Sequence, residues 1–128
     1  MITEWTDVAP TDMWSAAKAN RHYMHTHTTT QQMQVVLVSI EPEDKGIEAE
    51  VHTFSSQQFT VVKGRGTAVV GDKRIKLCPH VSFVVPANTR HEIINDSDEK
   101  RLVIISVYAP PVHEPNFMVV RRLHDDSY

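Results

Sequence analysis

Cysteine is nearly absent from this sequence of 128 residues, in which Cys78 stands alone. A single cysteine forms no intrachain disulfide, and a chain of this length can bury a hydrophobic core without one. The cysteine count therefore excludes the disulfide-rich secreted class and predicts a reducing, cytoplasmic setting.

The chain also lacks an excess of positive charge and any long apolar run. Lys and Arg number 13 against 16 Asp and Glu, so the net charge of −3 predicts no binding to nucleic acid or to an anionic membrane. No segment reaches the roughly 18 apolar residues of a membrane-spanning helix. The first residues have no basic region of the kind that begins a secretory signal. We therefore expect one soluble globular domain.

Short β-type runs dominate the chain from Met33 onward, and polar or proline-containing turns separate them. A parallel α/β fold would need helices between its strands, and the connections are too short for them. The pattern predicts an all-β antiparallel sandwich or barrel. The expected strands are residues 34–40, 47–52, 58–63, 67–70, 74–77, 81–85, 91–94 and 101–108.

The two ends of the chain differ from this strand series. Residues 1–30 are expected to form an N-terminal arm, with a short helix from about Thr11 to Lys18 that starts at a Thr/Asp capping signal. Residues 31–115 would form the barrel domain. Residues 116–128 would add a C-terminal edge strand and a tail.

Four side chains of metal-ligating type fall at the ends of expected strands. Because alternate strand residues share a face, Glu50 and His52 should project together. Gln57 opens the next strand after a short turn, and His91 opens a later one. Imidazole, carboxylate and amide groups can all bind a metal ion, so this set is a candidate metal site. The alternative is that Glu48 and Glu50 alternate on a solvent face, which would carry His52 out with them.

The stretch PANTRHEIIN resembles the second motif of the cupins, Gly-x5-Pro-x-Gly-x2-His-x3-Asn. Pro86, His91 and Asn95 stand at the motif's spacing. Asn88 replaces the second glycine, and asparagine tolerates positive φ better than most residues. His80 replaces the first glycine, which is a departure from the family pattern.

The first cupin motif, Gly-x5-His-x-His-x(3–4)-Glu-x6-Gly, fits in two registers. In one, His52 is the first histidine, and Phe54 takes the place of the second. In the other, Glu50 takes the place of the first histidine, His52 is the second, and Gln57 fills the glutamate position. We prefer the second register because it keeps the spacing to Gly64 and supplies four ligands. Moving the carboxylate also keeps the net charge of +1 that the usual ligand set has with a divalent ion.

The stretch YAPPVH at 108–113 extends the likeness to a small single-domain subgroup, often labelled mannose-6-phosphate isomerase-like. The resemblance implies a double-stranded β-helix (jelly-roll) barrel, a homodimer and a small-molecule ligand or substrate such as a sugar or keto compound. It further implies a divalent transition metal, whether Mn, Fe, Zn, Ni or Co, held by Glu50, His52, Gln57 and His91. Isomerase, lyase and oxygenase chemistries would all suit such a site.

Other residues are candidates for the surrounding pocket. Tyr108 and His113 could move protons at the barrel mouth, and Phe54 and Phe59 are expected to form core or pocket wall. Two alternatives stay open: a metal-free, non-catalytic cupin that binds a small molecule or protein, and a structural module whose barrel is filled by apolar side chains.

Overall fold

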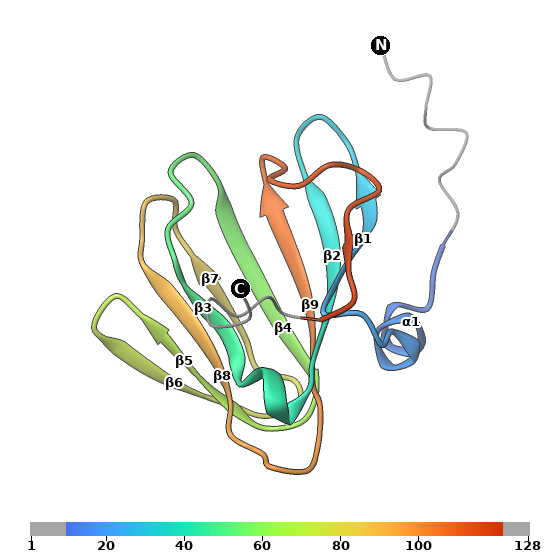
Figure 1. Cartoon of the computed structure of the whole chain (residues 1–128). Coiled ribbons are helices and arrows are strands. Elements are labelled where there is room, and N and C mark those ends of the chain that lie inside the picture. Colours follow the sequence, from blue (N-terminus) through green and yellow to red (C-terminus); the bar gives the residue numbers. More distant parts are fainter. Residues whose placement is uncertain (1–9, 122–128) are drawn as a thin grey trace, which may run out of the picture.

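Two antiparallel sheets face each other across the molecule in the computed structural model, which describes residues 10–121 (Figure 1). Within this range the larger sheet has six strands in the order β10-β1-β2-β9-β4-β7, and the smaller has four in the order β3-β8-β5-β6. This is the all-β jelly-roll architecture that the sequence predicts. The strands are β1 (Met24–Thr29), β2 (Gln34–Ile40), β3 (Gly46–Glu50), β4 (Ser56–Lys63), β5 (Gly66–Val70), β6 (Lys73–Leu77), β7 (Ser82–Val85), β8 (His91–Asn95), β9 (Leu102–Ala109) and β10 (Met118–Val119).

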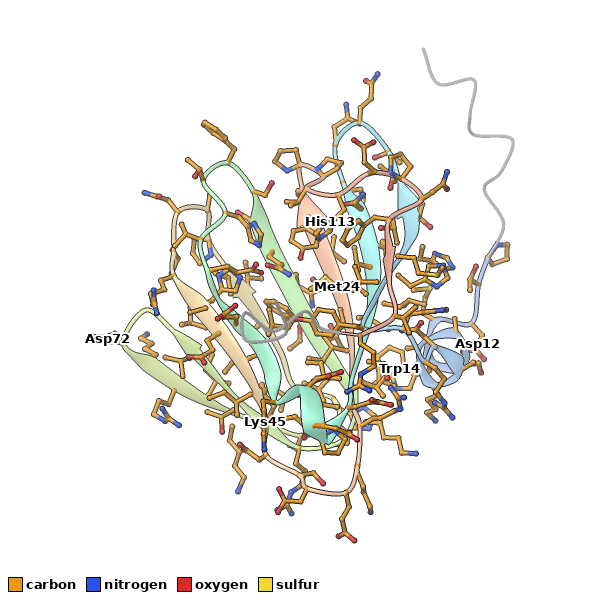
Figure 2. The ribbon with its side chains drawn as sticks, in the orientation of Figure 1. Asp12, Trp14, Met24, Lys45, Asp72 and His113 are labelled. Carbon is orange, nitrogen blue, oxygen red and sulfur yellow. The ribbon has the colours of Figure 1, made fainter. Side chains whose placement is uncertain are left out.

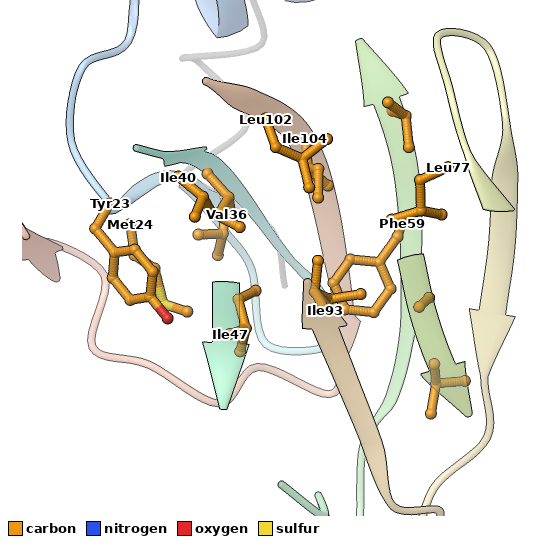
Figure 3. Packing of buried hydrophobic residues seen from close by; sticks show 14 of the residues in the cluster. Tyr23, Met24, Val36, Ile40, Ile47, Phe59, Leu77, Ile93, Leu102 and Ile104 are labelled. Atoms are coloured by element: carbon orange, nitrogen blue, oxygen red, sulfur yellow. The ribbon is translucent and has the colours of Figure 1, made fainter. Parts of the chain in front are cut away.

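The main hydrophobic core fills the space between the sheets. Alternate residues of each strand point inward, so the apolar members of both inner faces meet (Figure 3). Phe59 is fully buried there and stacks on Phe83, with ring centroids 5.1 Å apart. On β2 and β9, the two central strands of the larger sheet, the inward residues toward one end are all apolar: Val38, Ile40, Leu102 and Ile104.

The short helix α1 (Met13–Ala19) packs on the outer face of the larger sheet, against β2, β4 and β9. Asp12 caps it by accepting a hydrogen bond from the backbone N–H of Ser15 at 3.1 Å. Ala17 is fully buried in a second apolar cluster with outward-facing residues of the sheet. The helix lies close to the expected range of Thr11 to Lys18. No helix in the described part of the chain is long and apolar enough to cross a membrane.

The strand series starts earlier than expected. Residues 24–29 form β1, which pairs along β2, so the boundary predicted after residue 30 is too late. The sequence of β1 is rich in threonine and histidine, and this polar composition does not by itself indicate a strand. At the other end, β10 pairs with the edge of β1, and Arg121 binds the buried carboxylate of Asp44 at 2.8 Å. Residues 122–128 of the expected tail lie outside the described residues.

The structure offers a matched test of the core. Phe59→Ala should lower the free energy of unfolding by about 3–5 kcal/mol, because it removes a fully buried ring. Phe54→Ala is the control: that ring is 85% exposed, so the change should stay within about 0.5 kcal/mol. Urea unfolding of both variants measures the difference, and equal costs would contradict the assignment of the core.

Candidate metal centre

An irregularity in β3 sets the direction of Glu50. In the pairing with β8, Ile47 lies opposite Ile93 and Glu50 lies opposite His91. The two residues of β3 between these pairs, 48 and 49, therefore face one residue of β8, residue 92. This is the arrangement of a β-bulge, which reverses the alternation of side chains beyond it. Ile47 therefore points into the core, Glu48 is exposed, and Glu50 turns back toward His91. The alternative in which Glu48 and Glu50 share a solvent face is wrong for this reason.

Glu50, His52 and His91 form a cluster at one end of the sandwich. One ligand atom from each lies within 4.8 Å of the others. His52 Nε2 is 3.1 Å from Glu50 Oε1, and His91 Nε2 is 3.6 Å from the same oxygen. The two imidazole centroids are 5.3 Å apart. His52 lies just beyond the end of β3, where its carbonyl accepts a hydrogen bond from the backbone N–H of Asn88 at 2.7 Å.

Asn88 belongs to the turn before β8, and its φ of 63° has the positive sign expected from its place in the motif. This turn ties the segment carrying His52 to the strand that carries His91. His80, at the motif's other glycine position, also has a positive φ of 80°. The backbone conformation of the motif is thus kept without its glycines.

His91 presents a ring nitrogen suited to metal binding. Its Nδ1 lies 3.0 Å from the carbonyl oxygen of Thr89, which can only accept, so Nδ1 carries the hydrogen. In the neutral ring Nε2 then has a free lone pair. Nε2 is buried and makes no hydrogen bond with any described residue. A backbone carbonyl on one nitrogen and an open lone pair on the other is the usual setting of a ligating histidine.

Gln57 lies on β4, in the sheet opposite the one that carries Glu50 and His91. It shares the inner face of β4 with Phe59, whose ring lies 6.1 Å from that of His91. Gln57 is 2% exposed, and its amide nitrogen donates to the Ser106 hydroxyl at 2.8 Å. Its carbonyl oxygen accepts no hydrogen bond from the described residues. A buried amide oxygen without a donor is costly unless something else binds it, and a metal ion is one such partner.

Tyr108 and His113 stand beside the cluster. Tyr108 is 1% exposed, lies opposite Gln57 in the sheet, and packs edge-on against His52 at 5.3 Å between ring centroids. His113 Nε2 is 3.4 Å from the Tyr108 hydroxyl, and the imidazole stacks on Phe117 at 4.3 Å. Figure 2 shows His113 toward the end of the molecule away from Lys45.

The two phenylalanines expected in the core or pocket wall lie in different surroundings. Phe59 lies inside, close to His91. Phe54 is 85% exposed in the connection between β3 and β4, so its expected place in the pocket wall is wrong. The connection leaves the sheet at Glu50 and carries Phe54 outward before β4 returns.

The donor set fits a divalent transition metal. Two imidazoles and one carboxylate match the set that holds ferrous iron and related ions with open positions, and an amide oxygen would add a weak neutral donor. Two buried atoms without hydrogen bonds from the described residues, His91 Nε2 and Gln57 Oε1, belong to the four expected ligands.

Comparison with known proteins agrees with the fold and the motifs. A family model described as a cupin domain matches residues 36–108. This chain belongs to the cupin family. An uncharacterized protein, L612, of Acanthamoeba polyphaga mimivirus is 30% identical over 125 residues, covering 95% of this cupin and 78% of that protein.

Solved structures share the architecture. The crystal structure of BH2720 from Bacillus halodurans matches this cupin with a TM-score of 0.83 at 25% identity, over 89% of each chain. A cupin-2 domain containing protein from Shewanella frigidimarina matches with a TM-score of 0.61 at 16% identity, over 80% of this chain and 96% of that one. The second likeness shows the fold alone.

Two buried polar residues near the site were not among those expected from the sequence. Ser106 holds the amide of Gln57, and Gln34 binds the backbone around His113. Strand alternation could have indicated that both side chains are buried. Gln34 shares a face with Val36, Val38 and Ile40, and Ser106 shares one with Ile104 and Tyr108.

The pKa shifts of Glu50 and His91 have opposite signs. Burial raises the pKa of Glu50, but the hydrogen bond with His52 and the nearby His91 ring outweigh burial and lower it to about 2. Burial lowers the pKa of His91, but the Glu50 carboxylate and the Thr89 carbonyl outweigh burial and raise it above 6.5. Glu50 therefore stabilises the fold above its ordinary pKa of 4.5, and this contribution is lost as pH falls toward 2. His91 contributes below pH 6.5, and its contribution is lost as pH rises through the raised value.

In chelator-treated protein, Glu50→Gln should therefore destabilise the fold most between about pH 4.5 and 6.5 and less on either side. Urea unfolding of wild type and variant at about pH 3, 5.5 and 8.5 measures this. Glu48→Gln, on the exposed side of the same strand, is the control and should show no such maximum. A cost for Glu50→Gln that does not change with pH would contradict the ion-pair assignment.

Proposed function

We propose that this cupin is a metal-dependent protein that acts on a small polar organic substrate. Glu50, His52 and His91 would hold a divalent ion, and Gln57 would complete the set. The observation that carries the proposal is the buried Nε2 of His91, which makes no hydrogen bond with the described residues and lies beside a second imidazole and a carboxylate. When bound, such an ion supplies Lewis-acid polarisation of a substrate oxygen or activation of water or dioxygen.

The chain's own residues can handle protons next to that position. Burial, and then the charge of Glu50, raises the pKa of Tyr108 above its ordinary value, so the phenol keeps its proton at neutral pH. Burial lowers the pKa of His113, although Glu50 opposes this, so the imidazole is neutral there. A neutral phenol can donate a proton and a neutral imidazole can accept one. The pair could therefore move a proton between a substrate oxygen and the ring of His113.

The surroundings of the cluster favour a small substrate with several oxygen atoms. Phe59 stacks on Phe83 and its ring lies 6.1 Å from that of His91, while Gln57 binds Ser106 and pairs with Tyr108. A sugar or keto compound carries the oxygen atoms that such polar groups and a metal ion would bind. Isomerase, lyase and oxygenase chemistry all remain compatible with these residues.

The narrower likeness to the mannose-6-phosphate isomerase-like subgroup rests on the motif YAPPVH and supports no particular reaction, because one fold carries many activities. The homodimer and the cytoplasmic setting likewise stay predictions. Light scattering coupled to size-exclusion chromatography measures the first.

Metal titration of single variants tests the ligand set. His91→Ala and His52→Ala should each weaken binding of manganese, iron or zinc by at least about 100-fold, since even outer partners of ligands change affinity by 10–100-fold. Gln57→Leu should weaken it less, because an amide oxygen is a weaker donor than imidazole. His27→Ala is the matched control, since His27 lies exposed on β1 and its ring binds the Thr28 hydroxyl and no other side chain among residues 10–121.

Equal affinities in wild type and His91→Ala would contradict the proposal. So would wild type purified without chelator or nickel resin that holds less than about a tenth of an equivalent of metal and recovers none on addition. Either result would favour the metal-free, ligand-binding cupin instead. Loss of affinity in the His27 variant alone would place metal binding on the surface.

A further inference from the structure

The side chain of Gln34 joins β2 to the loop that carries His113. It is fully buried at the start of β2, where it pairs with Tyr108 of β9. Its amide nitrogen donates to the Thr29 hydroxyl at 3.0 Å and to the carbonyl oxygen of His113 at 2.7 Å. Its amide oxygen accepts from the backbone N–H of Val112 at 3.2 Å and of His113 at 2.9 Å.

These four contacts use both hydrogens of the amide nitrogen and both lone pairs of the oxygen, so the amide is fully satisfied. The partners also fix which end is oxygen, because a backbone N–H only donates and a backbone carbonyl only accepts. Both polar backbone groups of His113 are bound by this one side chain, 79 residues away in the sequence. The backbone on either side of the His113 side chain is therefore held against β2.

The imidazole that leaves this fixed backbone has a defined place. It lies edge-on to Tyr108, with ring centroids 5.2 Å apart, and stacks on Phe117 at an interplanar angle of 6°. Ser55 holds the same loop from the other side by donating to the carbonyl oxygen of Pro110 at 2.6 Å. Proton transfer needs donor and acceptor within hydrogen-bonding reach, so a loop free to move would separate His113 from Tyr108.

We propose that Gln34 is a positioning residue that holds His113 beside Tyr108 for the proton transfer described above. The role in proton transfer rests on the proposed function. The hydrogen bonds between Gln34 and the backbone of His113 are present without metal or substrate. Burying the polar amide of Gln34 costs free energy of folding, and an apolar residue at this position would stabilise the core at least as well. Its hydrogen bonds go mainly to the loop, so its effect should fall on His113 and not on the metal ligands.

The test is the NMR spectrum of the His113 ring in metal-free protein. In wild type, stacking on Phe117 should move the His113 ring-proton signals upfield of those of exposed His27, and His113→Ala identifies them by their loss. Gln34→Met keeps the side-chain length but leaves two N–H groups and one carbonyl without partners. It should return the His113 signals toward those of an exposed histidine, while the His91 signals keep their wild-type positions.

Two further variants keep the test decisive. Gln34→Glu retains the acceptor for both N–H groups and loses the donor to the His113 carbonyl, so it should give a smaller change in the same direction even if Gln34→Met does not fold. Gln31→Met removes an exposed glutamine from the preceding turn and should leave the His113 signals unchanged. Wild-type His113 signals in both Gln34 variants would overturn the proposal, and so would equal displacement of the His91 signals.

Failure of this inference and failure of the proposed function give different results. If metal titration of wild type fails while the His113 signals respond to Gln34, the proposed metal function is wrong and the positioning contact stands. If metal binds and His113 does not respond, the positioning role is wrong. With both correct, Gln34→Glu should still bind metal, since its substitution lies outside the ligand set.

Discussion

One extra residue in β3 determines whether a site exists at all. Glu48 and Ala49 together face the position of Glu92 on β8, and because of this bulge Glu50 lies opposite His91 on the inner side of the sandwich. With regular alternation from Ile47, Glu50 would point to solvent and His91 would lose its nearest anion. Gly46 helps to allow the close pairing here: a Cβ at this residue would lie 1.9 Å from the carbonyl oxygen of Ile93. Bulges often redirect side chains next to functional sites, and this one supplies the only carboxylate of the cluster.

The interior of the larger sheet divides into an apolar end and a polar end. Where β2, β9 and β4 pair, the row nearest the site consists of Gln34, Tyr108 and Gln57. The next row is Val36, Ser106 and Phe59, and the rows beyond it are apolar. Hydrophobic burial in the apolar rows can therefore stabilise the fold, while the row of Gln34, Tyr108 and Gln57 is held by specific hydrogen bonds. Such buried polar groups give the site a defined shape because each displaced partner leaves another group unsatisfied.

The sequence predicted the strands well because β-branched runs alternate with turn residues over most of the chain. β2 was expected at residues 34–40 and is found there. The polar, β-branched stretch HTHTTT was compatible with a loop or with the entry to a strand, and pairing with β2 makes most of it β1.

The site was less predictable than the fold. Motif spacing selected Glu50, His52 and His91, which the structure brings together. The reason for the direction of Glu50 was hidden, since a bulge depends on pairing with a distant strand. Phe54 was misplaced because hydrophobicity alone does not say which way a connection turns. Gln34 acts through the backbone of a loop 79 residues away, and no local pattern reveals such a contact.

The most direct measurement of the central claim is anomalous diffraction from crystals of this protein grown with zinc or manganese. The account predicts one dominant peak between the sheets, within about 2.0–2.3 Å of a ring nitrogen of His52, a ring nitrogen of His91 and a carboxylate oxygen of Glu50. The direct contact between Glu50 and His52, 3.1 Å in the metal-free arrangement, would be replaced by bonds to the ion. Peaks only at surface histidines, with Glu50 still bonded to His52, would contradict it.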